Sequence, residues 1–217
     1  LWTAVSSLQV GCPAPTISQA VYARSMSSFK ELREKTSSLL TAPQTDALSI
    51  EQKEEFIEQL HDALYCAKIC AYAQGFQLMK LASIEQNWDL NFASIAKIWR
   101  AGCIIRAAFL QSITQAFERD HTLENLLVDS FFAEQLSKYQ HNWRQAVARA
   151  TIMGIPIGAI SASLSYYDSM RSAVLPANLL QGQRDFFGAH TFKRIDKPVN
   201  HKYHVEWTAP GRPINKV

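Results

Sequence analysis

One long run of helical periodicity constrains this chain more than any other feature. From Ile50 to about Leu81, apolar or small side chains recur at alternating steps of three and four residues, which places them on one face of an α-helix. The positions are Ile57, Leu60, Leu64, Ala67, Ala71, Gln74, Leu78 and Leu81. Ser49 can cap the start of this helix, and acidic residues in its first turns suit the helix dipole. The run predicts the central helix of an all-α domain.

The other apolar patterns also predict helices. We expect them over residues 2–9, 17–40, 92–99, 103–119, 130–153, 157–172 and 176–187. Thr16 is the candidate N-cap of the helix over residues 17–40, and Asn91 is that of the helix over residues 92–99. Strand–helix alternation and a glycine-rich phosphate loop are both missing, so we expect no dinucleotide-binding domain within this sequence.

Composition excludes several classes of protein. Hydrophobic residues make up 47% and charged residues 19%, an ordinary globular balance. The net charge of +3 is too weak and too scattered to indicate a nucleic-acid partner. No apolar run reaches membrane-spanning length and no secretion signal is present, which predicts a soluble, cytoplasmic protein without a membrane partner. Because the chain begins at Leu1, inside an apolar helical pattern, we expect it to be part of a longer protein.

Metal binding is not expected either. The four cysteines stand in apolar, mostly helical surroundings, and we interpret them as buried free thiols: Cys12, Cys66, Cys70 and Cys103. Cys66 and Cys70 lie one turn apart but have no convincing third ligand nearby. His201 and His204 lie in a segment predicted to be extended, where residues three apart point to opposite sides.

A distinctive stretch lies near the end of the chain, at residues 175–191. Pro176 can open a short helix, and Gly188 can close it in a left-handed conformation. One side of this helix is apolar and should dock on another surface; it carries Leu179, Leu180, Gln183, Phe186 and Phe187. Arg184 at the edge of that side, with His190 just past the helix end, could bind a phosphate or carboxylate. From spacing alone the simpler interpretation is favoured, in which Arg184 and Asp185 form a solvated pair and His190 is a turn residue.

Arg24 is a second candidate. It is the only charge in the apolar first half of the helix predicted over residues 17–40. An unpaired charge in such a place is costly, so Arg24 either meets a carboxylate or faces a cleft that receives an anionic ligand. Spacing leaves these two alternatives open.

Several motifs resemble one enzyme family. The tail run is Leu-Pro-Ala-Asn-Leu-Leu-Gln-Gly-Gln-Arg-Asp-Phe-Phe-Gly-Ala-His-Thr. With it come Ile-Ser-Gln-Ala-Val-Tyr-Ala-Arg at 17–24, Ala-Lys-Ile-Cys-Ala-Tyr-Ala-Gln-Gly at 67–75 and Ile-Trp-Arg-Ala-Gly-Cys-Ile-Ile-Arg at 98–106. Asn-Leu-Leu-Val-Asp at 125–129 and Leu-Ser-Tyr-Tyr-Asp at 164–168 complete the set. Together they resemble the C-terminal domain of the decarboxylating 6-phosphogluconate dehydrogenases, over residues 2–207.

The resemblance implies an architecture and a site. Residues 1–188 would be an all-helical domain for substrate binding and dimerisation, and residues 189–217 an extended tail that docks on the partner subunit of a homodimer. Arg24 matches the arginine that binds the substrate phosphate. Arg184 and His190 match the tail residues that complete the neighbouring subunit's site. Gln19 stands where the family usually has an acidic residue.

The resemblance also implies a reaction. The family oxidises 6-phosphogluconate with NADP and decarboxylates the product to ribulose 5-phosphate, a step of the pentose phosphate pathway. Its cofactor domain and its catalytic lysine and glutamate would precede Leu1. We therefore assign no catalytic and no cofactor-binding residue to this chain, and we expect the chain alone to be inactive.

Two other functions are compatible with the sequence. The chain could be a truncated relative that serves as a non-catalytic binding or dimerisation module, which the sequence preceding Leu1 in the gene would decide. An unrelated helical scaffold is the weaker alternative, and it predicts no clustering of Arg24, Arg184 and His190.

Overall fold

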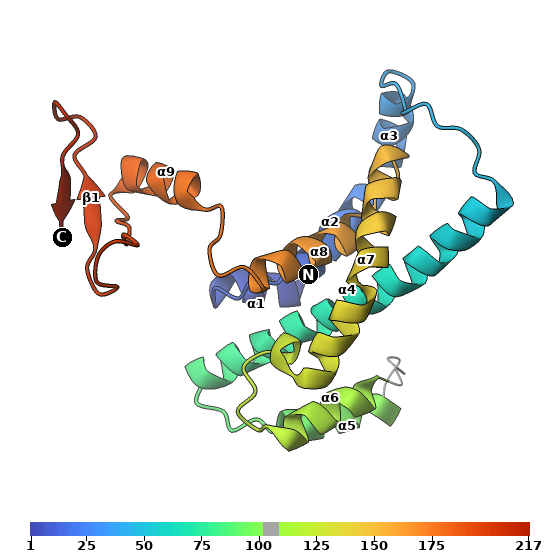
Figure 1. Cartoon of the computed structure of the whole chain (residues 1–217), viewed down its shortest axis with the longest axis horizontal. Helices are drawn as coiled ribbons and strands as arrows, with labels where there is room; N and C mark the ends of the chain where they lie inside the picture. Colours follow the sequence, from blue (N-terminus) through green and yellow to red (C-terminus); the bar gives the residue numbers. More distant parts are fainter. Residues whose placement is uncertain (102–108) are drawn as a thin grey trace. The chain divides into compact units, whose positions relative to one another are not determined.

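The computed structural model describes residues 1–101 and 109–217, and helices dominate it (Figure 1). The predicted all-α class is confirmed. The helices are α1 (Trp2–Gln9), α2 (Pro15–Ser28), α3 (Lys30–Ser37), α4 (Ile50–Glu85), α5 (Phe92–Ala101), α6 (Leu110–Arg119), α7 (Ser130–Ile152), α8 (Gly158–Met170) and α9 (Asn178–Gly188), with a short 3-10 helix, η1 (Leu126–Val128). Two short strands follow, β1 (Tyr203–Val205) and β2 (Ile214–Lys216). The first part of the helix predicted over 103–119 lies outside the described residues.

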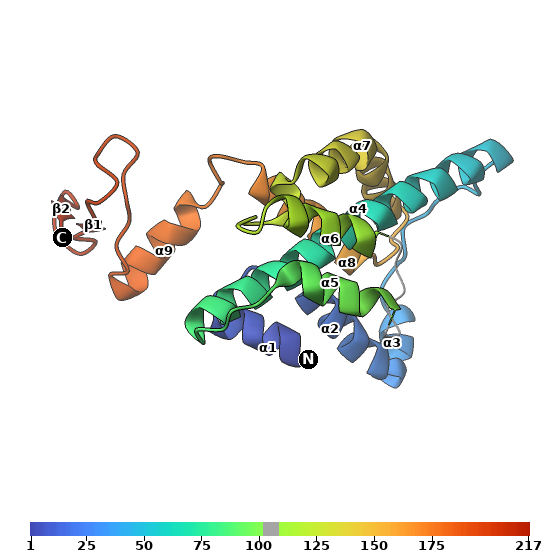
Figure 2. The ribbon, with the colours of Figure 1, turned by 90° about the horizontal axis from the view of Figure 1, so that it is seen from below.

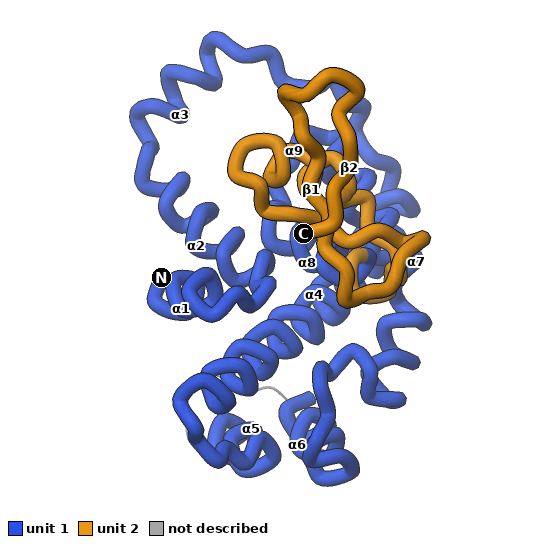
Figure 3. Tube along the Cα trace, turned by 90° about the vertical axis from the view of Figure 1, so that its left-hand side faces the viewer, with its two compact units in different colours: residues 1–168 blue, residues 169–217 orange. Residues whose placement is uncertain are grey.

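The chain divides into two units, residues 1–168 and 169–217 (Figure 3). The first contains α1 to α8 except for the last residues of α8. The second contains the end of α8, α9 and the hairpin. Helix α9 thus belongs with the tail. The predicted roles of residues 1–188 and 189–217 stay predictions.

Helix α4 is the centre of the first unit, as its periodicity predicted. Ser49 caps it with a capping box: the Ser49 hydroxyl accepts the Gln52 N–H at 3.3 Å, and the Gln52 side chain accepts the Ser49 N–H at 2.9 Å. Helix α7 packs across α4, and α5 and α6 lie side by side in both views (Figures 1 and 2). The middle of α4 carries small buried side chains, so these neighbours can approach closely.

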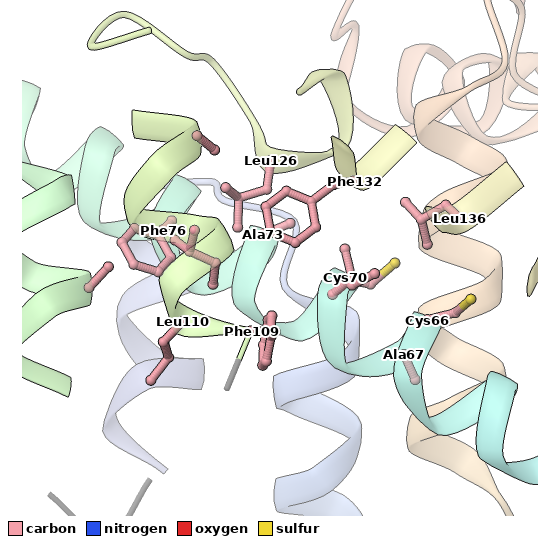
Figure 4. Close-up of a cluster of buried hydrophobic side chains, with 14 of the residues drawn as sticks. Cys66, Ala67, Cys70, Ala73, Phe76, Phe109, Leu110, Leu126, Phe132 and Leu136 are labelled. Atoms are coloured by element: carbon pink, nitrogen blue, oxygen red, sulfur yellow. The ribbon is translucent and has the colours of Figure 1, made fainter. Parts of the chain in front are cut away.

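The hydrophobic core of this unit fills the space around α4 (Figure 4). Larger side chains from the neighbouring helices and η1 pack against its small residues. Figure 4 labels Cys66, Ala67, Cys70, Ala73 and Phe76 on α4, with Phe109, Leu110, Leu126, Phe132 and Leu136 around them. Trp143 on α7 is also completely buried. The small residues of α4 leave space, and the aromatic and leucine side chains of the neighbouring elements fill it.

The prediction that Thr16 caps one helix over residues 17–40 is wrong in two respects. Ala14 is the N-cap residue of α2, and Pro15 is its first residue, where a missing N–H costs nothing. The helix then ends at Ser28, and α3 begins after Phe29, whose φ and ψ are −83° and 50°. Ser25, Ser27 and Ser28 lie at this break, and their hydroxyls donate to backbone carbonyls. Serine side chains that compete in this way weaken a helix.

Helix α9 also begins and ends differently from the prediction. Pro176 precedes the helix, whose N-cap is Ala177. The left-handed residue is Ala189, with φ 48° and ψ 39°, instead of Gly188. A Cβ at Gly188 would lie 2.8 Å from ring atoms of His190, so the ring keeps this position only beside a glycine. The glycine therefore makes room for the histidine ring.

The tail is folded onto α9 within the second unit. Strands β1 and β2 form an antiparallel hairpin in which Tyr203 pairs with Lys216 and Val205 with Ile214. Phe192 forms a further bridge with Tyr203. The extended tail predicted over residues 189–217 therefore contains a hairpin of its own. Among residues 1–101 and 109–217, no helix has both the length and the apolarity needed to cross a bilayer.

The core assignment predicts that alanine substitutions of two leucines in unit 1 lower the stability of the fold by very different amounts. Leu136 is 1% exposed and Leu64 is 61% exposed. Leu136→Ala should lower the free energy of unfolding by about 2–5 kcal/mol, because it leaves a cavity, and Leu64→Ala by less than about 1 kcal/mol. Urea denaturation followed by far-UV circular dichroism measures both. Equal losses would contradict this assignment.

Candidate functional site

Arg24 lies on the second half of α2 and is exposed. Its Nη1 donates to the Ser27 hydroxyl at 3.0 Å. Among the described residues, no carboxylate lies within ion-pair distance of it. Arg24 instead lines a groove of about 590 Å³ within unit 1. The other lining residues are mostly apolar: Leu1, Thr16, Ile17, Ala20, Val21, Ser25, Ala71 and Ala159. Because Arg24 is exposed, it avoids the cost of an unpaired buried charge, and its binding of an anionic ligand stays a prediction.

A buried polar network fixes α2 at the base of this groove. The Thr16 N–H donates to Oε1 of Gln74 on α4 at 3.0 Å, and Nε2 of Gln74 donates back to the Thr16 hydroxyl at 2.8 Å. The Thr16 hydroxyl is 2.8 Å from that of Ser163 on α8, which itself donates to the Ala159 carbonyl. Thr16 must then be the donor to Ser163. Because all three side chains are buried and satisfied, α2 has a defined position between α4 and α8.

Arg184 and His190 lie together in the second unit. With Gln183, Phe187 and Gly188 they line a hollow of about 270 Å³ at the end of α9. Both side chains are exposed, and neither makes a hydrogen bond or an ion pair with any described residue. Cationic groups at the C-terminal end of a helix interact favourably with its dipole. The hollow therefore offers a planar guanidinium and an imidazole, both with free donors, to an incoming anion.

Asp185 contradicts the expected solvated pair with Arg184. Its side chain is completely buried, and four donors surround it. Oδ1 accepts from the Thr191 N–H at 3.0 Å and lies 2.9 Å from Nδ1 of His204. Oδ2 accepts from the Val205 N–H and from Nε1 of Trp207, both at 3.0 Å. We call Asp185 with these four donors the Asp185 cluster.

The cluster controls the charge of Asp185. Burial on its own raises the pKa of a carboxyl group, because it disfavours the charged form. The donations from His204, Val205 and Trp207 stabilise the carboxylate and outweigh burial, so the pKa of Asp185 lies below its ordinary value. Asp185 is therefore a carboxylate at neutral pH, fully occupied within its own unit.

Arg24 lies in unit 1, and Arg184 with His190 lies in unit 2. The structure thus brings two of the three predicted residues together, and the convergence of all three stays a prediction.

The family model for the 6-phosphogluconate dehydrogenase C-terminal domain matches residues 1–207. The chain belongs to this family.

Individual members of the family are similar to the chain over nearly its whole length. The chain is 51% identical over 206 residues to the NADP(+)-dependent, decarboxylating 6-phosphogluconate dehydrogenase of Bacillus subtilis, covering 95% of this chain and 43% of that protein. It is 49% identical over 220 residues to the decarboxylating 6-phosphogluconate dehydrogenase of Schizosaccharomyces pombe, covering 99% and 44%. The 6-phosphogluconate dehydrogenase structure from Plasmodium falciparum matches with a TM-score of 0.87 at 43% identity, covering 95% and 44%. The chain therefore spans less than half the length of these relatives.

Gln19, where the resemblance implied an acidic residue, makes its contacts away from Arg24. It contacts Gly158 on α8, where a Cβ would collide with its side chain. It lines a different groove from the one that contains Arg24.

The described thiols are buried, and one of the two tail histidines has a carboxylate partner. Cys12, Cys66 and Cys70 are buried and free, as predicted, and Cys103 lies outside the described residues. Burial raises the pKa of Cys66 to about 12 and also raises that of Cys70, so both stay protonated and unreactive at neutral pH. His204 is a partner of Asp185. In the described part of the chain, no three His, Cys, Asp or Glu side chains gather in a group that could hold a metal ion.

The Asp185 cluster predicts an acid-sensitive tail. An unfolded Asp has a pKa of about 3.9. Because the folded value is lower, the stabilisation is complete above about pH 4 and is lost as pH falls through the folded pKa. The ¹³C resonance of the Asp185 carboxyl group should keep its carboxylate value from neutral pH down to this range and then shift. A transition centred well above it would mean that burial dominates and that the pKa is raised.

Proposed function

We propose that this chain is the C-terminal part of an NADP-dependent oxidative decarboxylase that converts 6-phosphogluconate to ribulose 5-phosphate and CO2. In it, the chain binds the substrate phosphate and forms the contacts of a homodimer. The observation that carries the proposal is the shared hollow of Arg184 and His190, whose donors are unused, in a chain of this family. Arg24, in a groove without a carboxylate partner, is the third proposed ligand of the phosphate.

The chemistry of the substrate suits these residues. A phosphate monoester carries close to two negative charges at neutral pH, and guanidinium groups bind such oxygens in a bidentate way. Two arginines without a ligand repel each other, so a dianion between them would be favoured. The role of Arg24, Arg184 and His190 in this proposal is to bind and orient the substrate. The proton transfers belong to groups that this chain does not supply.

The cofactor assignment is supported by the relatives. The Bacillus subtilis protein is named as NADP(+)-dependent, and the Plasmodium falciparum structures include complexes with NADP+ and with 6-phosphogluconate. When bound, NADP would accept the hydride in the oxidation. We propose no cofactor-binding residue in this chain. A place in the pentose phosphate pathway and in the cytoplasm follows from the same proposal.

The proposed homodimer is supported by the surface of α9. Leu179 is 88% exposed and Phe187 is 77% exposed, with Leu180 and Phe186 also exposed beside them. Contiguous apolar side chains on a helix are typical of a protein interface. We propose that a second copy of this chain covers them. The tail would then carry Arg184 and His190 to the partner's Arg24 site, so that each site is built from two subunits.

The proposed phosphate site predicts how two substitutions change substrate affinity in the complete enzyme. Arg24→Ala and Arg184→Ala should each weaken 6-phosphogluconate binding by roughly tenfold to a hundredfold, since a charge-assisted hydrogen bond contributes about 1.5–3 kcal/mol. Titration calorimetry measures this, with NADP affinity as the control. Arg212→Ala, on the turn between β1 and β2, is the charge-matched control in the tail. Unchanged substrate affinity in both variants would refute the site. Normal binding without turnover in the native gene product would favour the non-catalytic module.

The second prediction concerns the dimer. Deleting residues 189–217 would strip buried Asp185 of its donors, so a surface substitution is the cleaner test. Leu179→Glu should leave the fold of the free chain unchanged and convert the dimer to monomer, because it places a charge in the proposed interface. Size-exclusion chromatography with light scattering gives the mass. Lys193→Glu, an exposed change of charge in the same unit, is the control. A Leu179→Glu chain that stays dimeric would contradict the interface.

A further inference from the structure

Two side chains on α9 hold the backbone of one tail residue. Gln181 and Asp185 are four residues apart, so they lie on the same face of the helix. Nε2 of Gln181 donates to the Thr191 carbonyl, and the Thr191 N–H donates to Oδ1 of Asp185. Both backbone polar groups of Thr191 are therefore bound to the helix. We call Gln181 and Asp185 the Thr191 clamp.

The clamp holds a conformation that the chain would otherwise avoid. Thr191 has φ 60° and Ala189 has φ 48°, so left-handed residues stand on both sides of His190. A β-branched residue such as threonine is rarely found there, because its side chain collides with the backbone. The loop keeps this shape because Gln181 and Asp185 fix Thr191 in place.

The loop geometry brings His190 back over the helix. Its ring lies against Gly188, where a Cβ would come within 2.8 Å, and it shares a hollow with Arg184. Arg184 is next to Asp185 in sequence, and it projects from a different face of α9 into that hollow. Asp185 also binds His204, Val205 and Trp207, so the hairpin is fixed to the same carboxylate.

We propose that Asp185 and Gln181 are positioning residues that hold His190 beside Arg184, so that the two side chains close on one anionic group. They act through the backbone of Thr191 and do not touch the ligand. The anion part of this inference rests on the proposed function of Arg184 and His190. The positioning part rests on the contacts of the clamp alone.

The test uses NMR on the 217-residue chain with isotope-labelled histidine. One readout is the nuclear Overhauser effect between the His190 ring and the Gly188 α-protons, which reports position. The other is the movement of the His190 ring signals during titration with inorganic phosphate, which reports binding. The variants are Asp185→Asn, which presents an amide N–H₂ group to donors, and Gln181→Met, which removes one donor from a partly exposed side chain.

We expect both variants to lose most of the Overhauser effect and to bind phosphate about tenfold more weakly, with the helical circular dichroism of the chain retained. Asp196→Asn, a carboxylate-to-amide change at an exposed residue paired with Arg194, is the matched control and should behave like the original chain. The double variant Gln181→Met with Thr191→Gly should recover part of the Overhauser effect. Glycine adopts positive φ without strain, so the clamp is then less needed.

The positioning inference and the proposed anion site are contradicted by different results. If the Overhauser effect persists in Gln181→Met and in a folded Asp185→Asn, the clamp does not position His190 and the inference is wrong. If Asp185→Asn unfolds the tail, Gln181→Met and its glycine double variant decide the question. If the original chain has the Overhauser effect but its His190 signals ignore phosphate, the proposed anion site in this chain is contradicted, and the variants still decide whether the clamp positions His190.

Discussion

The packing of α4 is the constraint on which the first unit depends. A helix that is buried along its middle needs neighbours on several sides, and small side chains allow them to approach. Helices α2 and α7 and the short helix η1 all contact it. Gln74, in the middle of α4, is completely buried and gives both of its polar atoms to Thr16. The position of α2, and with it that of Arg24, is therefore set by the same helix that organises the core.

The two units position their cationic groups by different means. In unit 1, a neutral network of Thr16, Gln74 and Ser163 fixes a helix, and Arg24 projects from that helix two turns later. In unit 2, a charged carboxylate, Asp185, gathers donors from distant parts of the tail. A neutral network keeps its strength over a wide range of pH, whereas a carboxylate needs its charge. The two halves of the proposed phosphate site should therefore respond differently to acid.

What the sequence could predict was local. The cap at Ser49 and the long helix after it, and the cap at Asn91, whose side chain accepts the Ser94 N–H, follow from residues a few positions apart. The break at Phe29 was missed because helical periodicity continues through it, and the serines before it weaken the helix without interrupting the pattern. The pairing of Arg184 with His190 in one hollow depended on family resemblance. Spacing alone favoured two unrelated surface residues.

The Asp185 cluster could not be predicted from local pattern. Its partners His204 and Trp207 are 19 and 22 residues away, and an Asp beside an Arg usually lies in solvent. The only signal was the alternation of Tyr203, Val205 and Trp207, which indicates a strand but not its partner. The position of Gly188 was misread for a related reason. Its role is to leave volume for a ring, which depends on where His190 returns in space.

The convergence of four donors on one carboxylate has a consequence for how the tail folds. A buried charge that lacks some of its donors costs more than one that has never left water, so partly docked states of residues 191–207 are disfavoured. We therefore expect cooperative folding and unfolding of the hairpin, the left-handed loop and the packed position of the His190 ring. A proteolytic cut in the connection between Phe192 and Tyr203 would leave a short C-terminal peptide that carries three of the four donors. Such a peptide should rebind its own α9 as a ligand in trans.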